Sequence, residues 1–169
     1  MARMQSNSAT CRIDMLEANL KALRDRMPEL PLDALLCSRL LCHAGREIAS
    51  MLEQQLRPFG LSDAEFWVLT TLFSQPQRVA HPSDLCAGAG QSPANMSRIS
   101  DALVSRDLIT RVMSEQDRRR IVIRITEHGE ELVRQLLSKT FVPLHAMLKI
   151  FSEEEQLYLI SQLKRLAFP

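Results

Sequence analysis

The 169-residue sequence lacks any long hydrophobic run. Its apolar stretches fall far short of the roughly 20 residues that a membrane-spanning helix requires. The first residues also lack the uninterrupted apolar segment and the small-residue cleavage pattern of a secretory signal peptide. We therefore expect no membrane association and no secretion, and we predict a cytoplasmic protein.

Residue patterns of metal sites and enzymes are also missing. The cysteines show no C-x-x-C spacing, which disfavours a structural zinc site or a disulfide framework. No nucleophile with a base, no carboxylate pair at a strand end and no phosphate-binding glycine loop is recognisable, and Gly88-x-Gly90 is too short to count. The sequence predicts a protein that is not an enzyme and needs neither cofactor nor metal. The cysteines are Cys11, Cys37, Cys42 and Cys86.

Positive charge is concentrated in one part of the chain. The formal net charge is only +1, and such an average hides local patterning. From Ser92 to Thr126, however, there are seven arginines against four acids. Arg118, Arg119 and Arg120 are consecutive in this stretch. A basic surface confined to this segment is therefore expected.

The chain length favours a single domain, and apolar periodicity predicts helices in its first part. One apolar seam indicates a short helix that stops near Pro28 and Pro31. A longer helix is predicted from Leu32 to about Arg57, where Pro58-Phe59-Gly60 ends it. The short seam comprises Ile13, Leu16, Leu20, Leu23 and Met27, and the stripe of the longer helix comprises Cys37, Leu41, Ala44, Ile48, Met51 and Leu52.

The middle of the chain shows a helix-turn-helix pattern. Ser62-Asp63-Ala64-Glu65 is a capping box that predicts a helix from Asp63 to about Phe73. After a linker, Pro82 is placed for the first turn of a brief helix to Ala87, which Gly88 and Gly90 are expected to break. Ser92-Pro93 repeats the cap and predicts a helix to about Arg106. Two short capped helices around a glycine-bearing turn form this motif.

A hairpin and two further helices follow. Leu108–Met113 and Ile121–Ile125 predict a two-stranded hairpin whose loop carries the three arginines. Thr126 can cap a helix that Pro143 is expected to kink or break. Ser152-Glu153-Glu154-Glu155 caps a final helix that is apolar on two sides. Such a helix calls for two packing partners, one of which can be another chain.

This order predicts a mainly α protein with a small β-hairpin, a winged helix-turn-helix with flanking N- and C-terminal dimerisation helices. We expect an N-terminal extension over 1–31, a dimerisation region over 32–57 plus 127–169, and a DNA-binding region over 61–126. A helix fits the major groove of B-DNA, and a thin hairpin can follow phosphates or enter the minor groove. On the helix after Ser92, polar residues lie off the Met96, Ile99 and Leu103 stripe, and these are Pro93, Asn95, Ser97 and Arg98.

At this point the sequence resembles the MarR family of bacterial transcriptional regulators. Ser97-Arg98-Ile99-x-Asp101-x-Leu103 is similar to the family's recognition helix, and Asp117-Arg118-Arg119 with Thr126-Glu127-x-Gly129 is similar to its wing and next helix. Pro82-Ser83-Asp84-Leu85 and Asn95-x-Ser97-Arg98-Ile99 look closest to the EmrR-like subgroup, which represses multidrug efflux operons. The resemblance runs from about Leu32 to Phe168.

The resemblance implies a homodimeric repressor whose recognition helices enter successive major grooves of a pseudo-palindromic operator. It implies that Arg119 probes the minor groove while Asp117 orients it, and that small aromatic or lipophilic effectors bind between the dimerisation helices and the DNA-reading lobe. The candidate DNA-binding residues are Ser92, Pro93, Asn95, Ser97, Arg98, Asp117, Arg118, Arg119 and Arg120. The candidate ligand-binding residues are His43, Met51, Phe66 and Trp67. Two departures from the family pattern are Asp107, where a glycine is usual, and a long extension before Leu32.

Several alternatives stay open at this stage. The arginine-rich loop can be a solvated turn, Arg98 can pair with Asp101 or Asp84, and Arg111 and Arg124 can be ordinary exposed strand residues. A protein-interaction module built on a winged helix that binds no DNA is a further alternative.

A cysteine-based redox-sensing repressor is the alternative function. Cys37 lies on the helix that would carry a sensing thiol, but on its apolar stripe, and burial opposes a reactive thiolate. Arg39 is the one basic residue within a turn, and Tyr158 is the one tyrosine in the chain. Cys42 and His43 are adjacent and so point about 100° apart on a helix, which disfavours joint metal binding.

Overall fold

The computed structural model describes residues 15, 18–113 and 121–167. The chain divides into two compact units, Met1–Ala49 and Ser50–Pro169. In the first unit, residues 18–26 are helical and the long helix α2 (Leu32–Leu56) begins. The guanidinium of Arg24 lies 3.9 Å from the carboxylate of Asp33. Of the predicted apolar seam in this unit, Leu20 and Leu23 are half-buried and Met27 is exposed.

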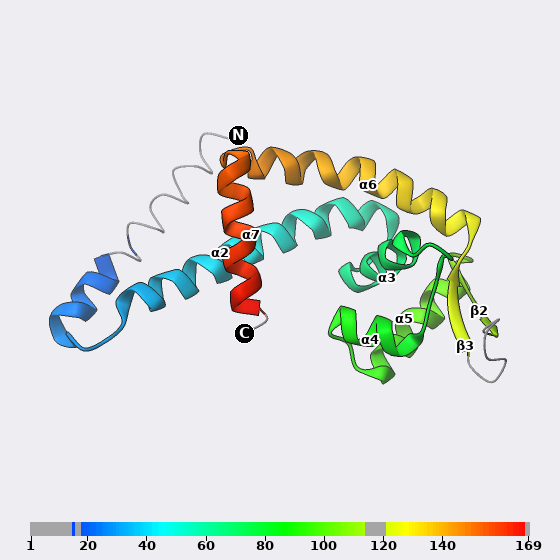
Figure 1. Cartoon of the computed structure of the whole chain (residues 1–169), viewed down its shortest axis with the longest axis horizontal. Coiled ribbons are helices and arrows are strands. Elements are labelled where there is room, and N and C mark those ends of the chain that lie inside the picture. Colours follow the sequence, from blue (N-terminus) through cyan, green and yellow to red (C-terminus); the bar gives the residue numbers. More distant parts are fainter. Residues whose placement is uncertain (1–14, 16–17, 114–120, 168–169) are drawn as a thin grey trace. The chain divides into compact units, whose positions relative to one another are not determined.

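The second unit contains the remaining elements (Figure 1), in an order that matches the prediction closely. The 3-10 turn η1 (Arg57–Phe59) ends α2 and leads to α3 (Asp63–Ser74), which is followed by the short strand β1 (Val79–Ala80). The helices α4 (Pro82–Ala89) and α5 (Pro93–Ser105) come next, followed by the strands β2 (Ile109–Met113) and β3 (Ile121–Ile125). The long α6 (Glu127–Leu148) and α7 (Glu153–Ala167) complete the unit.

The predicted capping boxes are confirmed at two helix starts. At α3, the backbone N–H of Glu65 donates to Ser62 Oγ over 3.3 Å and the N–H of Ser62 donates to Glu65 Oε2 over 2.7 Å. The same reciprocal pair joins Ser152 and Glu155 at α7, at 3.3 Å and 2.7 Å. The Ser152 N–H, followed by its hydroxyl, lowers the pKa of Glu155 because both stabilise the carboxylate. Each box satisfies N–H groups that a helix start leaves without a partner.

The sheet has three strands where the sequence predicted two. The order is β1-β3-β2 with both pairs antiparallel, and β1 pairs Val79 with Arg124 and Ala80 with Ile123. A strand of two residues is too short to show an alternating apolar pattern, so periodicity does not predict it. Because β1 leads into α4 and pairs with β3, it joins the helix-turn-helix to the hairpin.

Gly88 does not break α4, although Gly90 ends it as predicted, and Pro143 does not break α6. Gly88 lies inside α4, and the helix ends at Gly90, with φ at 59°. A Cβ at Gly88 would lie 2.4 Å from Cη2 of Trp67, so this glycine serves the close packing of α4 on α3. Pro143 also lies within α6, which continues to Leu148.

The core gathers side chains from α3, α4, α5, α6 and the sheet. Its largest fully buried members are Leu56, Leu69, Leu72, Leu85, Met96, Leu103, Leu108, Ile109, Ile123 and Leu136. In the described part of the chain, no helix combines the length and apolar character needed to cross a membrane.

Asp107 adopts the left-handed conformation expected at the position where the family has glycine, with φ at 54°. Its N–H donates to Val104 O over 2.9 Å, and the N–H of Leu108 donates to Leu103 O over 3.0 Å. These bonds form a Schellman motif that ends α5 and directs the chain into β2. Leu103 and Leu108 are both buried and supply the apolar contact that accompanies this motif.

Gly129 provides a test of the junction between β2 and α6. A Cβ there would lie 2.2 Å from the carbonyl oxygen of Leu108 and 2.8 Å from Cγ1 of Ile125. We expect Gly129→Ala to lower the free energy of unfolding by about 1–3 kcal/mol, as overpacking does. Denaturant unfolding at matched protein concentration measures this. Gly45→Ala is the control, because nothing lies within 4 Å of its added Cβ, and alanine in a helix should stabilise by up to about 1 kcal/mol. Equal effects of the two substitutions would contradict the assigned packing.

Candidate nucleic-acid interface

The second helix of the helix-turn-helix, α5, presents a polar face to solvent. Met96, Ile99 and Leu103 are buried, as the apolar stripe predicted. Asn95, Ser97 and Arg98 are therefore turned outward, and all three are exposed. The side chains that carry hydrogen-bonding groups for base edges or phosphates thus share one accessible surface.

The start of α5 is built from the predicted capping residues. Ser92 Oγ accepts a hydrogen bond from the backbone N–H of Asn95 over 3.3 Å. Pro93 occupies the first helical turn, where an N–H group would have no partner within the helix, so its missing N–H costs no hydrogen bond. The side-chain amide of Asn95 donates to Gln91 Oε1 over 2.5 Å. Asn95 is thereby held at the exposed N-terminal end of the helix.

The first turn of α5 carries no acidic residue. Each of the other five α-helices with described bounds has at least one acid there, from Asp33 in α2 to Glu153 in α7. A helix N-terminus bears partial positive charge, which nearby carboxylates offset. On α5 this potential stays available to an external anion, which suits a helix end that approaches phosphates.

An ion pair links α5 to the hairpin. Arg111 Nη2 on β2 lies 2.6 Å from Asp101 Oδ1 on α5. Arg98 has no hydrogen bond or ion pair with any other described residue, so its predicted alternative pairing with Asp101 or Asp84 is wrong. Arg111 is an exposed strand residue, as predicted, and it also forms this ion pair. The pair offsets the one negative charge on the outer face of α5 and leaves Arg98 available.

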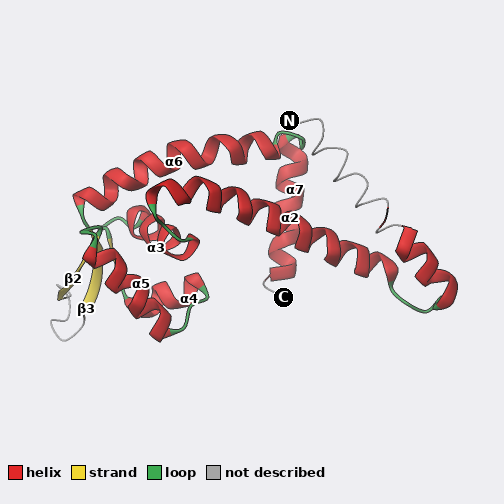
Figure 2. Ribbon diagram, turned by 180° about the vertical axis from the view of Figure 1, so that it is seen from behind, coloured by secondary structure: helices red, strands yellow, loops and turns green. Residues whose placement is uncertain are grey.

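The hairpin next to α5 is regular up to the end of its described part. The β2 and β3 strands pair from Ile109 with Ile125 to Met113 with Ile121, and Figure 2 shows them beside α5. The predicted loop 114–120, which includes Asp117, Arg118, Arg119 and Arg120, lies outside the described residues. The last described pair of the ladder, Met113 with Ile121, lies on either side of this loop in the sequence.

Arg106 is a further structural residue of the site that sequence reasoning did not single out. Its guanidinium donates to the carbonyls of Phe59 over 2.8 Å and Gly60 over 2.9 Å. This fixes the C-terminal end of α5 to the turn that precedes α3. A basic residue at the end of a helix suggests carbonyl contacts, but the sequence gives no sign that they come from residues so far along the chain.

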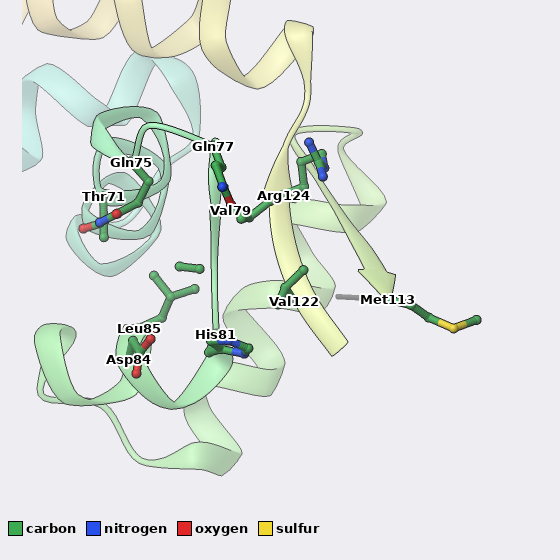
Figure 3. Close-up of a pocket in the computed structure, with 11 residues that line it drawn as sticks. Thr71, Gln75, Gln77, Val79, His81, Asp84, Leu85, Met113, Val122 and Arg124 are labelled. Atoms are coloured by element: carbon green, nitrogen blue, oxygen red, sulfur yellow. The ribbon is translucent and has the colours of Figure 1, made fainter. Parts of the chain in front are cut away.

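Two hollows lie beside the helix-turn-helix. An apolar groove of about 840 Å³ separates α4 and α5 from the hairpin, with Met96, Ser97, Arg111 and Ile123 among its lining residues. A second hollow of about 630 Å³ lies between α3, β1, α4 and β3. Figure 3 shows its lining, with Thr71 from α3 and Gln75 just after that helix opposite Val122 and Arg124 from β3.

The candidate ligand-binding residues are distributed over both units. His43 lies on α2 in the first unit, with Nδ1 3.9 Å from Glu47 Oε1. Met51 is half-buried near the end of α2, and Phe66 and Trp67 pack against the core from α3. Trp67 also abuts Gly88 of α4. The two aromatic residues thus have structural roles in packing.

The thiols are more accessible than the sequence indicated. Cys37 and Cys42 are exposed and Cys86 is half-buried, so the predicted burial of Cys37 on an apolar stripe is not seen in this chain. Among the described residues, no group of three or more His, Cys, Asp or Glu side chains is placed to hold a metal ion.

A winged helix-turn-helix whose second helix has a polar outer face and no acid in its first turn is typical of DNA-binding proteins. Comparisons with known proteins agree with this class. A model described as MarR family matches residues 59–120. The transcriptional repressor MprA of Escherichia coli is 32% identical over 141 residues, which cover 83% of this chain and 80% of MprA. The chain belongs to the MarR family and is a DNA-binding transcriptional regulator.

Solved structures support the same fold. AbsC, a MarR family transcriptional regulator from Streptomyces coelicolor, superposes with a TM-score of 0.76 and 25% identity, over 82% of this chain and 94% of AbsC. CouR from Rhodococcus jostii, whose structure has p-coumaroyl-CoA bound, superposes with a TM-score of 0.71 and 23% identity, over 77% of this chain and 90% of CouR. The predicted mainly α winged-helix class is confirmed.

Proposed function

We propose that this protein is a homodimeric repressor that reads a pseudo-palindromic operator with α5 in the major groove and the hairpin loop at the flanking minor groove. The observation that carries the proposal is the outer face of α5. Asn95, Ser97 and Arg98 are exposed there, and the first turn holds no acid. The ordered β2-β3 ladder leads from the end of this helix to a loop with three arginines.

The proposed contacts divide by chemistry. Arg98 and Asn95 have the hydrogen-bonding groups that suit the edges of guanine and adenine, respectively. Ser92, Pro93 and Ser97 are proposed to contact the sugar-phosphate backbone of the DNA near the start of α5. Arg119 is proposed to enter the minor groove, with Asp117 orienting it and with Arg118 and Arg120 near phosphates. The concentration of arginines makes the phosphate contribution large and dependent on salt.

Homodimerisation is proposed through the region 32–57 plus 127–169, with 61–126 as the DNA-binding region. Large apolar side chains are exposed on α6 and α7, including Phe141 at 58%, Val142 at 69%, Leu157 at 67% and Tyr158 at 68%. Exposed apolar surface of this extent on neighbouring elements marks an interaction site. A second copy of the chain is the occupant that twofold-symmetric DNA half-sites require.

Release by a small aromatic or lipophilic compound is part of the proposal, with His43, Met51, Phe66 and Trp67 as candidate contacts. CouR, which shares the fold, holds a phenolic thioester, and this supports a phenolic class of effector. Control of multidrug efflux genes is proposed from the resemblance of the Pro82–Leu85 and Asn95–Ile99 segments to the EmrR-like subgroup.

If the loop between β2 and β3 contacts DNA, removing Arg119 should lower DNA affinity, whereas removing a positive charge elsewhere should not. Arg119→Ala should weaken binding to DNA from upstream of the protein's own gene by about 1–3 kcal/mol. The log-log salt dependence of the wild type should have a slope near about −0.9 per neutralised phosphate. Fluorescence anisotropy across a salt series measures both. Lys21→Ala, which removes one exposed positive charge from the first unit, is the control. Wild-type affinity in Arg119→Ala would show that the loop does not contact DNA.

The dimer assignment predicts that charge on α7 separates the subunits. Leu157→Glu should shift the sedimentation mass at micromolar concentration from two chains toward one, because a carboxylate would then have to be buried in an apolar interface. Ser105→Glu places the same charge at an exposed polar position of α5, outside the proposed dimerisation region, and should leave the mass unchanged. A wild-type protein that sediments as one chain at every concentration would refute the proposal.

The effector assignment predicts that phenolic acids compete with DNA. Titration of a preformed protein–DNA complex with a panel of aromatic acids and neutral lipophilic phenols should release DNA at concentrations that depend on ligand structure. Matched aliphatic acids are the control for ionic strength and charge. If no aromatic compound releases more DNA than its aliphatic counterpart, the proposed effector class is wrong.

A further inference from the structure

Arg78 combines a rare backbone conformation with an unusually complete set of contacts. Its φ is 60°, a left-handed value that side chains other than glycine rarely adopt. Such conformations persist when the surrounding structure holds them, and they are often associated with function. Arg78 directly precedes the two-residue strand β1, so its conformation sets the direction in which that strand runs.

The backbone of Arg78 is bonded on both sides. Its N–H donates to the carbonyl of Gln75 over 3.1 Å, which closes the turn after α3. Its own carbonyl accepts the N–H of Ile125 over 3.1 Å, at the end of β3. The left-handed residue therefore fixes the start of β1 between α3 and the central strand of the sheet.

The guanidinium of Arg78 joins the same turn to α6. It donates to the carbonyls of Phe73 and of Gln75, the latter over 3.3 Å, at the C-terminal end of α3. Its Nε lies 3.1 Å from Glu130 Oε1 in the first turns of α6. Its Cζ stacks 4.6 Å above the centre of the Phe73 ring. One side chain thus connects α3, β1 and α6.

Because β1 pairs with β3, the contacts of Arg78 also affect the β2-β3 hairpin. The strand β1 covers the outer edge of β3, and β3 is the strand that emerges from the arginine-rich loop. Figure 3 shows β1 running from Gln77 past Val79 to His81, between α3 and β3. Because β1 contributes only the Val79 and Ala80 positions to the ladder, its attachment depends on what anchors its first end.

We propose that Arg78 is a positioning residue for DNA binding, one that holds β1 against α3 and α6 and thereby sets the orientation of the β2-β3 hairpin relative to α5. The inference rests on the proposed contact of the wing with the minor groove. Its chemical basis is the planar fork of arginine, which can bond several carbonyls and a carboxylate at once while it stacks on an aromatic ring. Lysine cannot reproduce this set of contacts.

Arg78→Gly is the decisive variant, because glycine keeps the left-handed backbone without strain while it removes the whole side chain. We expect operator affinity to fall about tenfold, or about 1.4 kcal/mol, with helix content and dimer mass unchanged. Hydroxyl-radical footprinting should lose the flanking minor-groove protection of the wing and keep the protection next to α5. Wild-type affinity, or an even weakening across the whole footprint, would overturn the inference.

Arg134→Ala is the matched control. Arg134 also binds Glu130, with Nη2 2.7 Å from Oε2, and its Cζ lies 5.4 Å from the Phe73 ring centre, but it makes no contact with β1. It should therefore bind the operator with near wild-type affinity and an unchanged footprint. Equal losses in Arg134→Ala and Arg78→Gly would assign the effect to the α3–α6 contact in general and would contradict a role for β1.

Glu130→Gln covers the case in which Arg78→Gly does not fold, since it leaves the left-handed backbone intact and weakens only the ion pair. A selective loss of flanking protection supports the inference, and an unchanged footprint contradicts it. Amide hydrogen exchange without DNA separates this inference from the proposed function. Faster exchange in β1 and β3 but not in α5 supports the anchoring role of Arg78 even if the wild type forms no specific complex, and unchanged exchange rejects it.

Discussion

Burial of Met96, Ile99 and Leu103 beneath α5 determines which of its side chains face outward, and the proposed contact surface for DNA depends on that orientation. The three apolar residues leave Asn95, Ser97 and Arg98 exposed on the other side. The helix is held at both ends. The Ser92 cap defines its start, and the Schellman motif at Asp107 defines its end. Arg106 then ties that end to the turn before α3.

Electrostatics agree with this orientation. A near-neutral chain can still bind a polyanion if its acids are kept away from the contact surface. In the other described helices, acids in the first turn interact favourably with the partial positive charge of the helix N-terminus. The start of α5 is stabilised by the neutral Ser92 cap instead. Asp101 is offset by Arg111 over 2.6 Å. The start of α5 is therefore stabilised by a neutral cap, and no carboxylate in its first turn would repel the phosphates of the proposed DNA partner.

The sequence was sufficient for features that depend on local chemistry. Ser62-x-x-Glu65, Ser92-Pro93 and Ser152-x-x-Glu155 marked helix starts because capping needs residues only a few positions apart. The sequence was insufficient where packing between residues far apart in the chain determines the local structure. Gly88 remains helical because Trp67 needs the space of its missing Cβ, and β1 exists because β3 offers it a free edge. The partners of Arg78, Arg106 and Arg111 lie on other elements, so no spacing rule predicts them.

The central claim is that two copies of α5 and its hairpin meet one side of a duplex at fixed separation. Affinity for operators of altered centre length tests this most directly. Inserting about five base pairs, half a helical turn, between the half-sites places the second half-site on the opposite side of the DNA. The account predicts that high-affinity binding collapses to the level of a single half-site. Undiminished affinity for the lengthened operator would contradict it.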